Sequence, residues 1–202
     1  MFPAIVMSTA EEIRKKITEL PPGKPFTPAI FSTIAERSNI DKTLNRLVSS
    51  GFIEKPARGI FVRPEQSRFG SLPVEPLEVA AAKANAPVEI HGAEALRRLG
   101  LSTQVPVRPV FYTAGRSKTF EVNGVPVRLQ HISAKKLVRT GTMVGMVISA
   151  LWYLGKEGVT NEVLAVIRSK LSEEEYEQLK ASAPSMPGWM SQALLRFDKA
   201  YE

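Results

Sequence analysis

The chain has 202 residues, of which 44% are hydrophobic, and its formal net charge is +7 at pH 7. No run of 18 apolar residues occurs, so we expect no transmembrane helix, and the start lacks the basic and cleavage regions of a signal peptide. Cysteine is absent, which excludes disulfides, zinc–thiolate sites and cysteine nucleophiles and suits a reducing cytoplasm. The basic balance favours an anionic partner such as nucleic acid or an acidic protein, although a solvated basic surface would have the same composition.

The first two predicted elements are helices. Ser8 to Glu11 has the form of a capping box, which predicts a helix through Leu20, with an apolar face formed by Ile13, Ile17 and Leu20. Thr27 and Pro28 predict the start of a second helix, with Thr27 as its N-cap and a buried face formed by Ile30, Phe31 and Ile34.

A third helix is predicted from about Asn39 to Ser50, and its two faces differ in character. The apolar residues recur at helical spacing and form one stripe, made of Ile40, Leu44, Leu47 and Val48. The opposite face carries residue types that contact base edges and phosphates: Lys42, Asn45, Arg46 and Ser49. Gly51 occupies the position after the helix where a left-handed residue favours glycine.

A short β-hairpin is predicted after this helix. Strands at residues 52–54 and 60–63 flank a turn at Pro56 to Gly59, with Gly59 supplying a positive φ in a type I turn plus bulge. Three helices and a basic hairpin are the arrangement of a winged helix-turn-helix, in which the third helix enters the major groove and the hairpin contacts the backbone or minor groove. The candidate DNA-binding residues are Ser38, Lys42, Asn45, Arg46, Ser49, Lys55 and Arg58. Winged helices also serve as protein-packing modules, so this alternative stays open.

The position of the charge favours DNA. Between Arg37 and Arg68 the sequence has seven basic residues and only three acidic ones, so more than half of the net charge lies in this stretch. We place the domain boundary in the Gly/Pro-marked segment from Arg68 to Pro73, which gives an N-terminal domain over residues 1–70 and a C-terminal domain over residues 71–202.

The C-terminal domain is predicted to be mixed α/β with a helical tail, so the whole chain is expected to be α+β. Strands are expected at 87–91, 107–113, 119–122 and 125–132, with Asn123-Gly124 as a hairpin turn and Pro109 arguing that its strand lies at a sheet edge. Helices are expected at 76–85, 93–99, 141–154, from Ser172 and at 189–201.

No motif announces catalysis. The P-loop, dinucleotide-binding, HExxH and GxSxG patterns are all absent. Glu89, His91 and Glu94 could form a weak metal site, but residues at a strand end usually have structural roles, so we expect no metal. Because the catalytic and cofactor-binding motifs are absent, we also expect no cofactor and no catalytic residue. Two polar loops flank the strand at 107–113 and offer candidate partner contacts at Ser102, Thr103, Gln104, Arg116 and Lys118, which could equally be surface turns.

Several of these segments resemble AbiEi-type antitoxins. The N-terminal match is carried by Leu44 to Ile53 and by Ala57 to Phe61, and the later match by the LGLSTQVP run from Leu99 to Pro106 and by Tyr112 to Gly115. The resemblance extends from about Ile13 to Gly155. It implies a bacterial transcriptional regulator of a type IV toxin–antitoxin pair, with an N-terminal domain that binds the operator of its own operon as a repressor. Its C-terminal domain would antagonise a nucleotidyltransferase-like toxin, with or without direct contact.

Two other functions are compatible with the same residues. One is an enzyme in which a nuclease-like C-terminal domain cuts or modifies nucleic acid, but no carboxylate or histidine constellation in the sequence supports it. The other is an orphan transcriptional regulator with no toxin encoded beside it. No membrane partner is expected.

Overall fold

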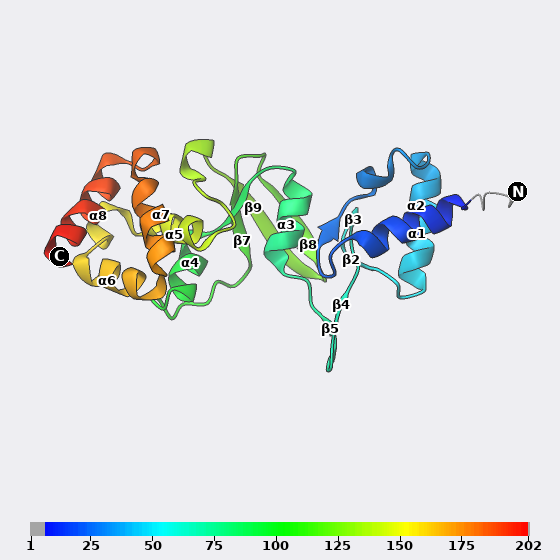
Figure 1. Ribbon diagram of the computed structural model, residues 1–202, viewed down its shortest axis with the longest axis horizontal. Helices are drawn as coiled ribbons and strands as arrows, with labels where there is room; N and C mark the ends of the chain where they lie inside the picture. The colour runs from blue at the N-terminus through cyan, green and yellow to red at the C-terminus, as the bar shows by residue number, and fades with distance from the viewer. Residues whose placement is uncertain (1–6, 202) are drawn as a thin grey trace, which may run out of the picture. The chain divides into compact units, whose positions relative to one another are not determined.

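The computed structural model describes residues 7–201 and shows a mixed α+β protein (Figure 1), as the sequence predicts. The chain forms two compact units. The first unit ends at Lys83 and also contains residues 120–125, whereas the second contains residues 84–119 and the chain from Pro126 onward. Residues 71–83, which the sequence analysis assigned to the C-terminal domain, therefore lie in the first unit.

The first unit begins with helices and a three-stranded sheet. Its first six elements are α1 (Thr9–Glu19), β1 (Pro25–Phe26), the 3₁₀ helix η1 (Pro28–Phe31), α2 (Arg37–Ser49), β2 (Glu54–Ala57) and β3 (Ile60–Val62). The sheet order is β1-β3-β2, with both pairings antiparallel. A single core joins these elements, made of Ile13, Ile17, Phe26, Phe31, Ile40, Leu44, Ile53 and Phe61.

The capping signals in the sequence predicted the first helix correctly, but they predicted a longer second helix than the structure contains. The capping box at α1 is confirmed: the Ser8 hydroxyl accepts from the Glu11 N–H, and the Glu11 carboxylate accepts from the Ser8 N–H at 2.7 Å. The pKa of Glu11 is lowered by the hydrogen bonds that Ser8 makes to its carboxylate, first through the Ser8 backbone N–H and then through the Ser8 side chain. At the second helix, Thr27 holds the N-cap position without a side-chain hydrogen bond, and only the 3₁₀ turn η1 forms. Phe26 instead pairs with Phe61, so β1 adds a strand that the sequence analysis missed.

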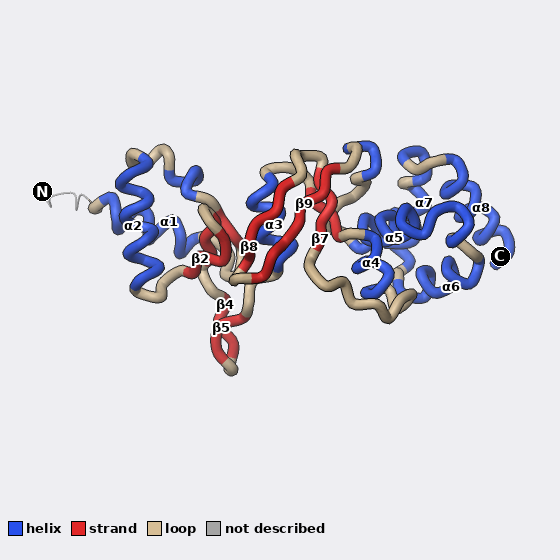
Figure 2. The backbone as a smooth tube through the Cα atoms, turned by 180° about the vertical axis from the view of Figure 1, so that it is seen from behind, coloured by secondary structure: helices blue, strands red, loops and turns tan. Residues whose placement is uncertain are grey.

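The predicted domain junction is a regular hairpin. Strands β4 (Glu65–Ser67) and β5 (Gly70–Leu72) pair antiparallel and form the separate two-stranded ribbon seen in Figure 2. The Ser67 hydroxyl closes its turn, since it donates to the Gly70 carbonyl at 2.8 Å and accepts from the Phe69 N–H. Helix α3 (Pro76–Ala84) follows and buries Val79 and Ala80. Glycine, serine and proline thus marked a turn within the first unit and not its end.

The second unit contains most of a four-stranded sheet in the order β6-β7-β9-β8, although residues 120–125, at the end of β8 and the start of β9, belong to the first unit. Its elements are β6 (Val88–Ile90), α4 (Gly92–Arg98), β7 (Val110–Thr113), β8 (Lys118–Val122) and β9 (Val125–His131). The hairpin turn at Asn123 and Gly124 is confirmed, with positive φ values of 49° and 79°. The predicted edge position of the Pro109 strand is wrong, because β7 lies between β6 and β9. Pro109 precedes β7, so its missing N–H costs no ladder bond, while its carbonyl accepts from the Arg128 N–H.

Helices complete the second unit. They are η2 (Ala134–Lys136), α5 (Met143–Gly158), α6 (Asn161–Lys170), α7 (Glu173–Ala181), η3 (Ala183–Ser185) and α8 (Gly188–Tyr201). Every residue from Val144 to Leu151 in α5 is buried, because this helix packs against α4, β6, α7 and α8. Gly155 has a φ of 69° and interrupts the helix close to the end that the sequence predicts.

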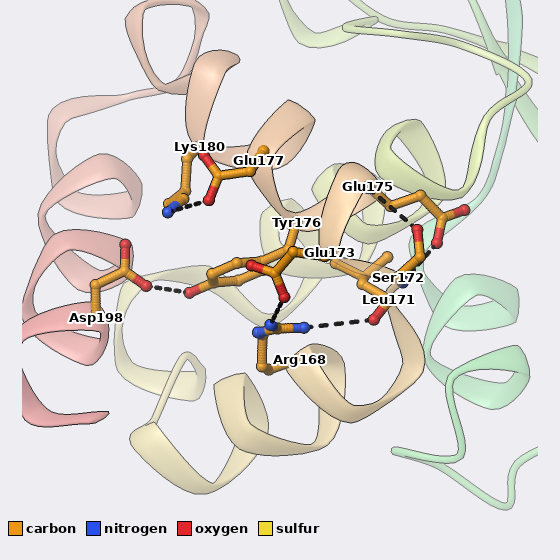
Figure 3. A network of polar contacts seen from close by, with 9 residues as sticks. All are labelled: Arg168, Leu171, Ser172, Glu173, Glu175, Tyr176, Glu177, Lys180 and Asp198. Atoms are coloured by element: carbon orange, nitrogen blue, oxygen red, sulfur yellow. Dashed lines mark hydrogen bonds and ion pairs between the residues drawn. The ribbon is translucent and has the colours of Figure 1, made fainter. Parts of the chain in front are cut away.

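A polar network joins the last three helices (Figure 3). Tyr176 of α7 is buried, and its hydroxyl donates to the Asp198 carboxylate of α8. The Arg168 guanidinium of α6 lies 4.5 Å from the centre of the Tyr176 ring and pairs with Glu173. Burial, followed by the contact with Asp198, raises the pKa of Tyr176. The neutral Tyr176 side chain therefore links α7 to α6 through its ring and to α8 through the hydrogen bond that its hydroxyl donates.

Candidate nucleic-acid interface

Helix α2 presents one continuous polar face. Its five candidate residues follow one another at helical spacing and are all exposed: Ser38, Lys42, Asn45, Arg46 and Ser49. The face therefore offers two cations, one amide and two hydroxyl groups along its length. Those are the side-chain types that form hydrogen bonds with base edges and phosphate oxygens.

The opposite side and the end of α2 hold this face in position. Ile40, Thr43 and Leu44 are buried, and Ile40 and Leu44 belong to the core of the first unit. At the C-terminus, the N–H of Phe52 donates to the carbonyl of Leu47, and Gly51 takes a φ of 72°, as predicted. This pair of features is a Schellman motif, which ends the helix and directs the chain into β2.

The two central cations of the face have no acidic partner in the described part of the chain. Arg37, at the start of α2, instead forms an i,i+4 ion pair with Asp41 at 2.9 Å. No such pair involves Lys42 or Arg46 among residues 7–201. Both side chains therefore keep their full charge available to an external anion.

The β2–β3 hairpin carries the other two predicted DNA-binding residues. Lys55 is exposed on β2, with its ammonium group 5.7 Å from the centre of the Phe61 ring, and Arg58 is exposed at the turn. Gly59 follows with a φ of 76°, and the strand register shifts between Glu54 and Ala57, as expected for a bulged hairpin.

The backbone of this hairpin tip is braced from two sides, which the sequence analysis did not foresee. The Lys83 ammonium group of α3 donates to the Arg58 carbonyl at 2.6 Å. The Asn123 N–H, at the turn of the β8–β9 hairpin, donates to the Pro56 carbonyl at 2.8 Å. Both partners are distant in sequence, so no local pattern could have indicated them. The tip is therefore held by its carbonyls while the Arg58 guanidinium stays exposed.

A second exposed hairpin tip was missed as a candidate. Phe69, at the β4–β5 turn, is 86% exposed, and the Arg68 guanidinium carbon lies 4.7 Å from the centre of its ring. The sequence analysis treated these residues as a linker. An exposed aromatic residue beside an arginine in the glycine-marked segment was the signal available.

The five predicted partner-contact residues stay in two separate loops at opposite ends of β7. Before β7, Thr103 and Gln104 are exposed and Ser102 is half-buried, with its hydroxyl accepting from the Gln104 N–H at 3.2 Å. After β7, Arg116 is exposed and Lys118 is half-buried as the first residue of β8. The structure therefore does not gather these five residues into one surface.

The three residues considered as a weak metal site, Glu89, His91 and Glu94, each make structural contacts. Glu89 is buried and accepts from the N–H groups of Ile90 and Gly141, and burial raises its pKa. His91 caps α4 through its Nδ1, which accepts from the Ala93 N–H, and burial lowers its pKa. Glu94 holds the two arginines that follow it, Arg97 and Arg98. Across residues 7–201 no group of three acidic or histidine side chains is arranged to hold a metal ion.

Taken together, these elements define a two-unit α+β protein with an exposed polar and basic helix face in its first unit. The chain belongs to a family of unknown function (DUF6088), whose model matches residues 12–179. No curated protein matches the chain. No solved structure matches it either. None of the helices within residues 7–201 is long and apolar enough to cross a membrane.

Proposed function

We propose that this protein is a cytoplasmic DNA-binding antitoxin that represses transcription of its own toxin–antitoxin operon. In this proposal the elements from α1 to β3 act as a winged helix-turn-helix. Helix α2 reads the major groove of the operator, and the β2–β3 hairpin contacts the phosphate backbone as the wing. The observation that carries the proposal is the exposed α2 face, whose Lys42 and Arg46 have no ion pair within residues 7–201.

The wing assignment draws support from Lys55 and Arg58. Both are exposed, and the hairpin tip is braced through its backbone carbonyls at Pro56 and Arg58. Holding a hairpin by its carbonyls leaves its side chains free to contact a phosphate backbone. Phosphate contacts position a protein on the duplex, whereas base contacts specify the sequence. We therefore assign base recognition to α2, whose Lys42 and Arg46 also contact phosphates, and assign positioning alone to the wing.

The antitoxin part of the proposal concerns the second unit and draws on the resemblance to AbiEi-type antitoxins. From Leu72 to the end, the chain has 16 basic and 13 acidic residues, but the second unit itself, residues 84–119 and 126–202, has 15 basic and 10 acidic residues. Its charge balance therefore does not separate a protein partner from DNA, and the resemblance alone supports this part of the proposal. The partner would be a nucleotidyltransferase-like toxin, and the loops with Gln104 and Arg116 are the candidate contacts.

DNA binding is tested with the full-length protein and a duplex taken from the region upstream of its own gene. Fluorescence anisotropy should give tighter binding to this duplex than to a shuffled duplex of the same composition. The affinity should fall steeply as salt rises, because the contacts release counterions. Equal affinity for both duplexes would reject operator recognition. Cleavage of the duplex in the presence of Mg²⁺ would favour the nuclease alternative.

Antitoxin activity is tested by co-expression with the nucleotidyltransferase-like protein encoded beside the gene, if one is found there. The toxin should be expressed from an unrelated promoter, so that repression cannot account for protection. Growth rescue by the wild-type protein, and by a Lys42→Glu/Arg46→Glu variant that no longer binds DNA, would support antagonism by the second unit. Absence of rescue would reduce the proposal to an orphan transcriptional regulator.

A further inference from the structure

The second unit contains a cavity of about 240 Å³ that the proposed DNA interface does not use. Side chains from the sheet, from η2 and from α5 line it, among them Glu89, Tyr112, Lys136, Trp152 and Tyr153. Pockets for drug-sized ligands measure about 300–1,000 Å³, so this cavity suits a single ring system. The cavity brings together an acidic side chain, a basic side chain and three aromatic rings, whereas packing alone would need only apolar side chains.

The Glu89 carboxylate lies at the buried end of the cavity. Glu89 is 3% exposed, and each of its carboxylate oxygens accepts one backbone N–H, from Ile90 at 2.8 Å and from Gly141 at 3.0 Å. A carboxylate has about four acceptor positions, so two remain for a ligand. The two backbone bonds also fix the orientation of the carboxylate before any ligand arrives.

The aromatic rings form the walls. His91 does not line the cavity and fills the space between two of these rings, with its ring centre 4.7 Å from that of Tyr112 and 5.3 Å from that of Tyr153. The Lys136 ammonium group lies 4.2 Å from the centre of the Trp152 ring, and the Lys136 side chain is exposed. The cavity thus combines the oriented Glu89 carboxylate, an aromatic lining and the solvent-exposed Lys136 ammonium group.

We propose that this cavity binds a guanine mononucleotide, an inference that stands apart from the DNA-binding proposal. Guanine presents two neighbouring donors, its ring N–H and its exocyclic amino group, which match the two free acceptor positions of the Glu89 carboxylate. Adenine and cytosine each have a ring-nitrogen acceptor beside their amino group. That ring nitrogen would face the carboxylate oxygen as a second acceptor, so the two would repel each other instead of forming a hydrogen bond. The planar base packs against the aromatic lining, and the phosphate outside pairs with Lys136.

The test is titration calorimetry of the full-length protein with GMP, AMP and guanosine. GMP should bind to one site, and AMP at least about tenfold more weakly, because AMP leaves a buried acceptor without a donor. Trp152 and Trp189 are the only tryptophans. A Trp189→Phe variant should therefore show quenching of the remaining tryptophan fluorescence as GMP binds. No saturable heat with GMP, or equal affinity for AMP, would overturn the proposal.

Two variants separate the roles of the ends of the cavity. Glu89→Gln should weaken GMP and guanosine alike by at least about tenfold. Lys136→Met should weaken GMP but leave guanosine unchanged, because only the phosphate contact is lost. Lys135→Met is the matched control, since Lys135 is an exposed neighbour on η2 that does not line the cavity. If Lys136→Met and Lys135→Met bind GMP as tightly as the wild type, the proposed phosphate contact is wrong.

Discussion

Replacing Lys42 and Arg46 by alanine in the full-length protein is expected to weaken DNA binding strongly and leave the fold intact. Each lost phosphate contact lowers the salt slope of log K by about 0.9, so at 0.15 M salt two contacts are worth about thirtyfold in affinity. Both side chains are exposed and lie outside the buried side of α2, so the free energy of unfolding should change by less than about 0.5 kcal/mol.

The assay is fluorescence anisotropy with the upstream duplex at several salt concentrations. The matched control is Lys156→Ala/Lys170→Ala, which removes two exposed cations from the second unit and changes the net charge equally. The α2 variant should lose about two units of salt slope, as expected for two phosphate contacts, and the control should keep the wild-type slope. If both variants lose affinity to the same extent, net charge and not the α2 face drives binding, and the reasoning fails.

Three further predictions concern stability. Gly51→Ala should cost about 1–2 kcal/mol in urea unfolding, because alanine is strained at a φ of 72°; Gly188→Ala, where φ is not positive and space is open, should be nearly neutral, and equal effects would contradict this account. Tyr176→Phe should cost about 1–3 kcal/mol, because it removes the bond to a carboxylate, and unchanged urea stability would mean that this bond contributes nothing. Burial raises the pKa of Glu89 above 4.5, so its contribution to stability is present at acidic pH and is lost as the pH rises through the folded-state pKa. Glu89→Gln should therefore lessen the fall in stability from acidic to neutral pH, and superimposable pH profiles of the two proteins would refute this.

The features that the sequence predicted well depend on neighbours along the chain. The capping box at Ser8, the start of α7 after Ser172, the glycine that ends α2 and the Asn123-Gly124 turn all form within six residues, so short patterns contain the information. The exposed face of α2 follows from the same kind of signal, because an amphipathic helix can bury only its apolar side. The types and order of most elements could therefore be predicted.

The features that escaped prediction depend on distant partners. Phe26 forms a strand only because Phe61 is available to pair with it. The sheet order that places β7 in the interior arises from a parallel pairing with β9, which no local pattern encodes. The buried contacts of Glu89 also needed the fold, since its carboxylate meets Gly141, 52 residues later in the chain. Sequence reasoning favoured a structural role for Glu89 but could not name the backbone N–H groups that its carboxylate binds.

The discontinuity of the first unit has a consequence for its synthesis. Residues 120–125 complete this unit, and the Asn123 N–H supports the Pro56 carbonyl, yet residues 84–119 must be made in between. At about 5–20 residues per second, translation from Ala84 to Val125 takes roughly 2–8 s. A nascent chain can thus assemble α1, α2 and the β2–β3 hairpin early, but the brace at Pro56 arrives only once much of the second unit's sheet has been translated. A product that terminates prematurely before residue 120 would carry the α2 face on an unfinished unit.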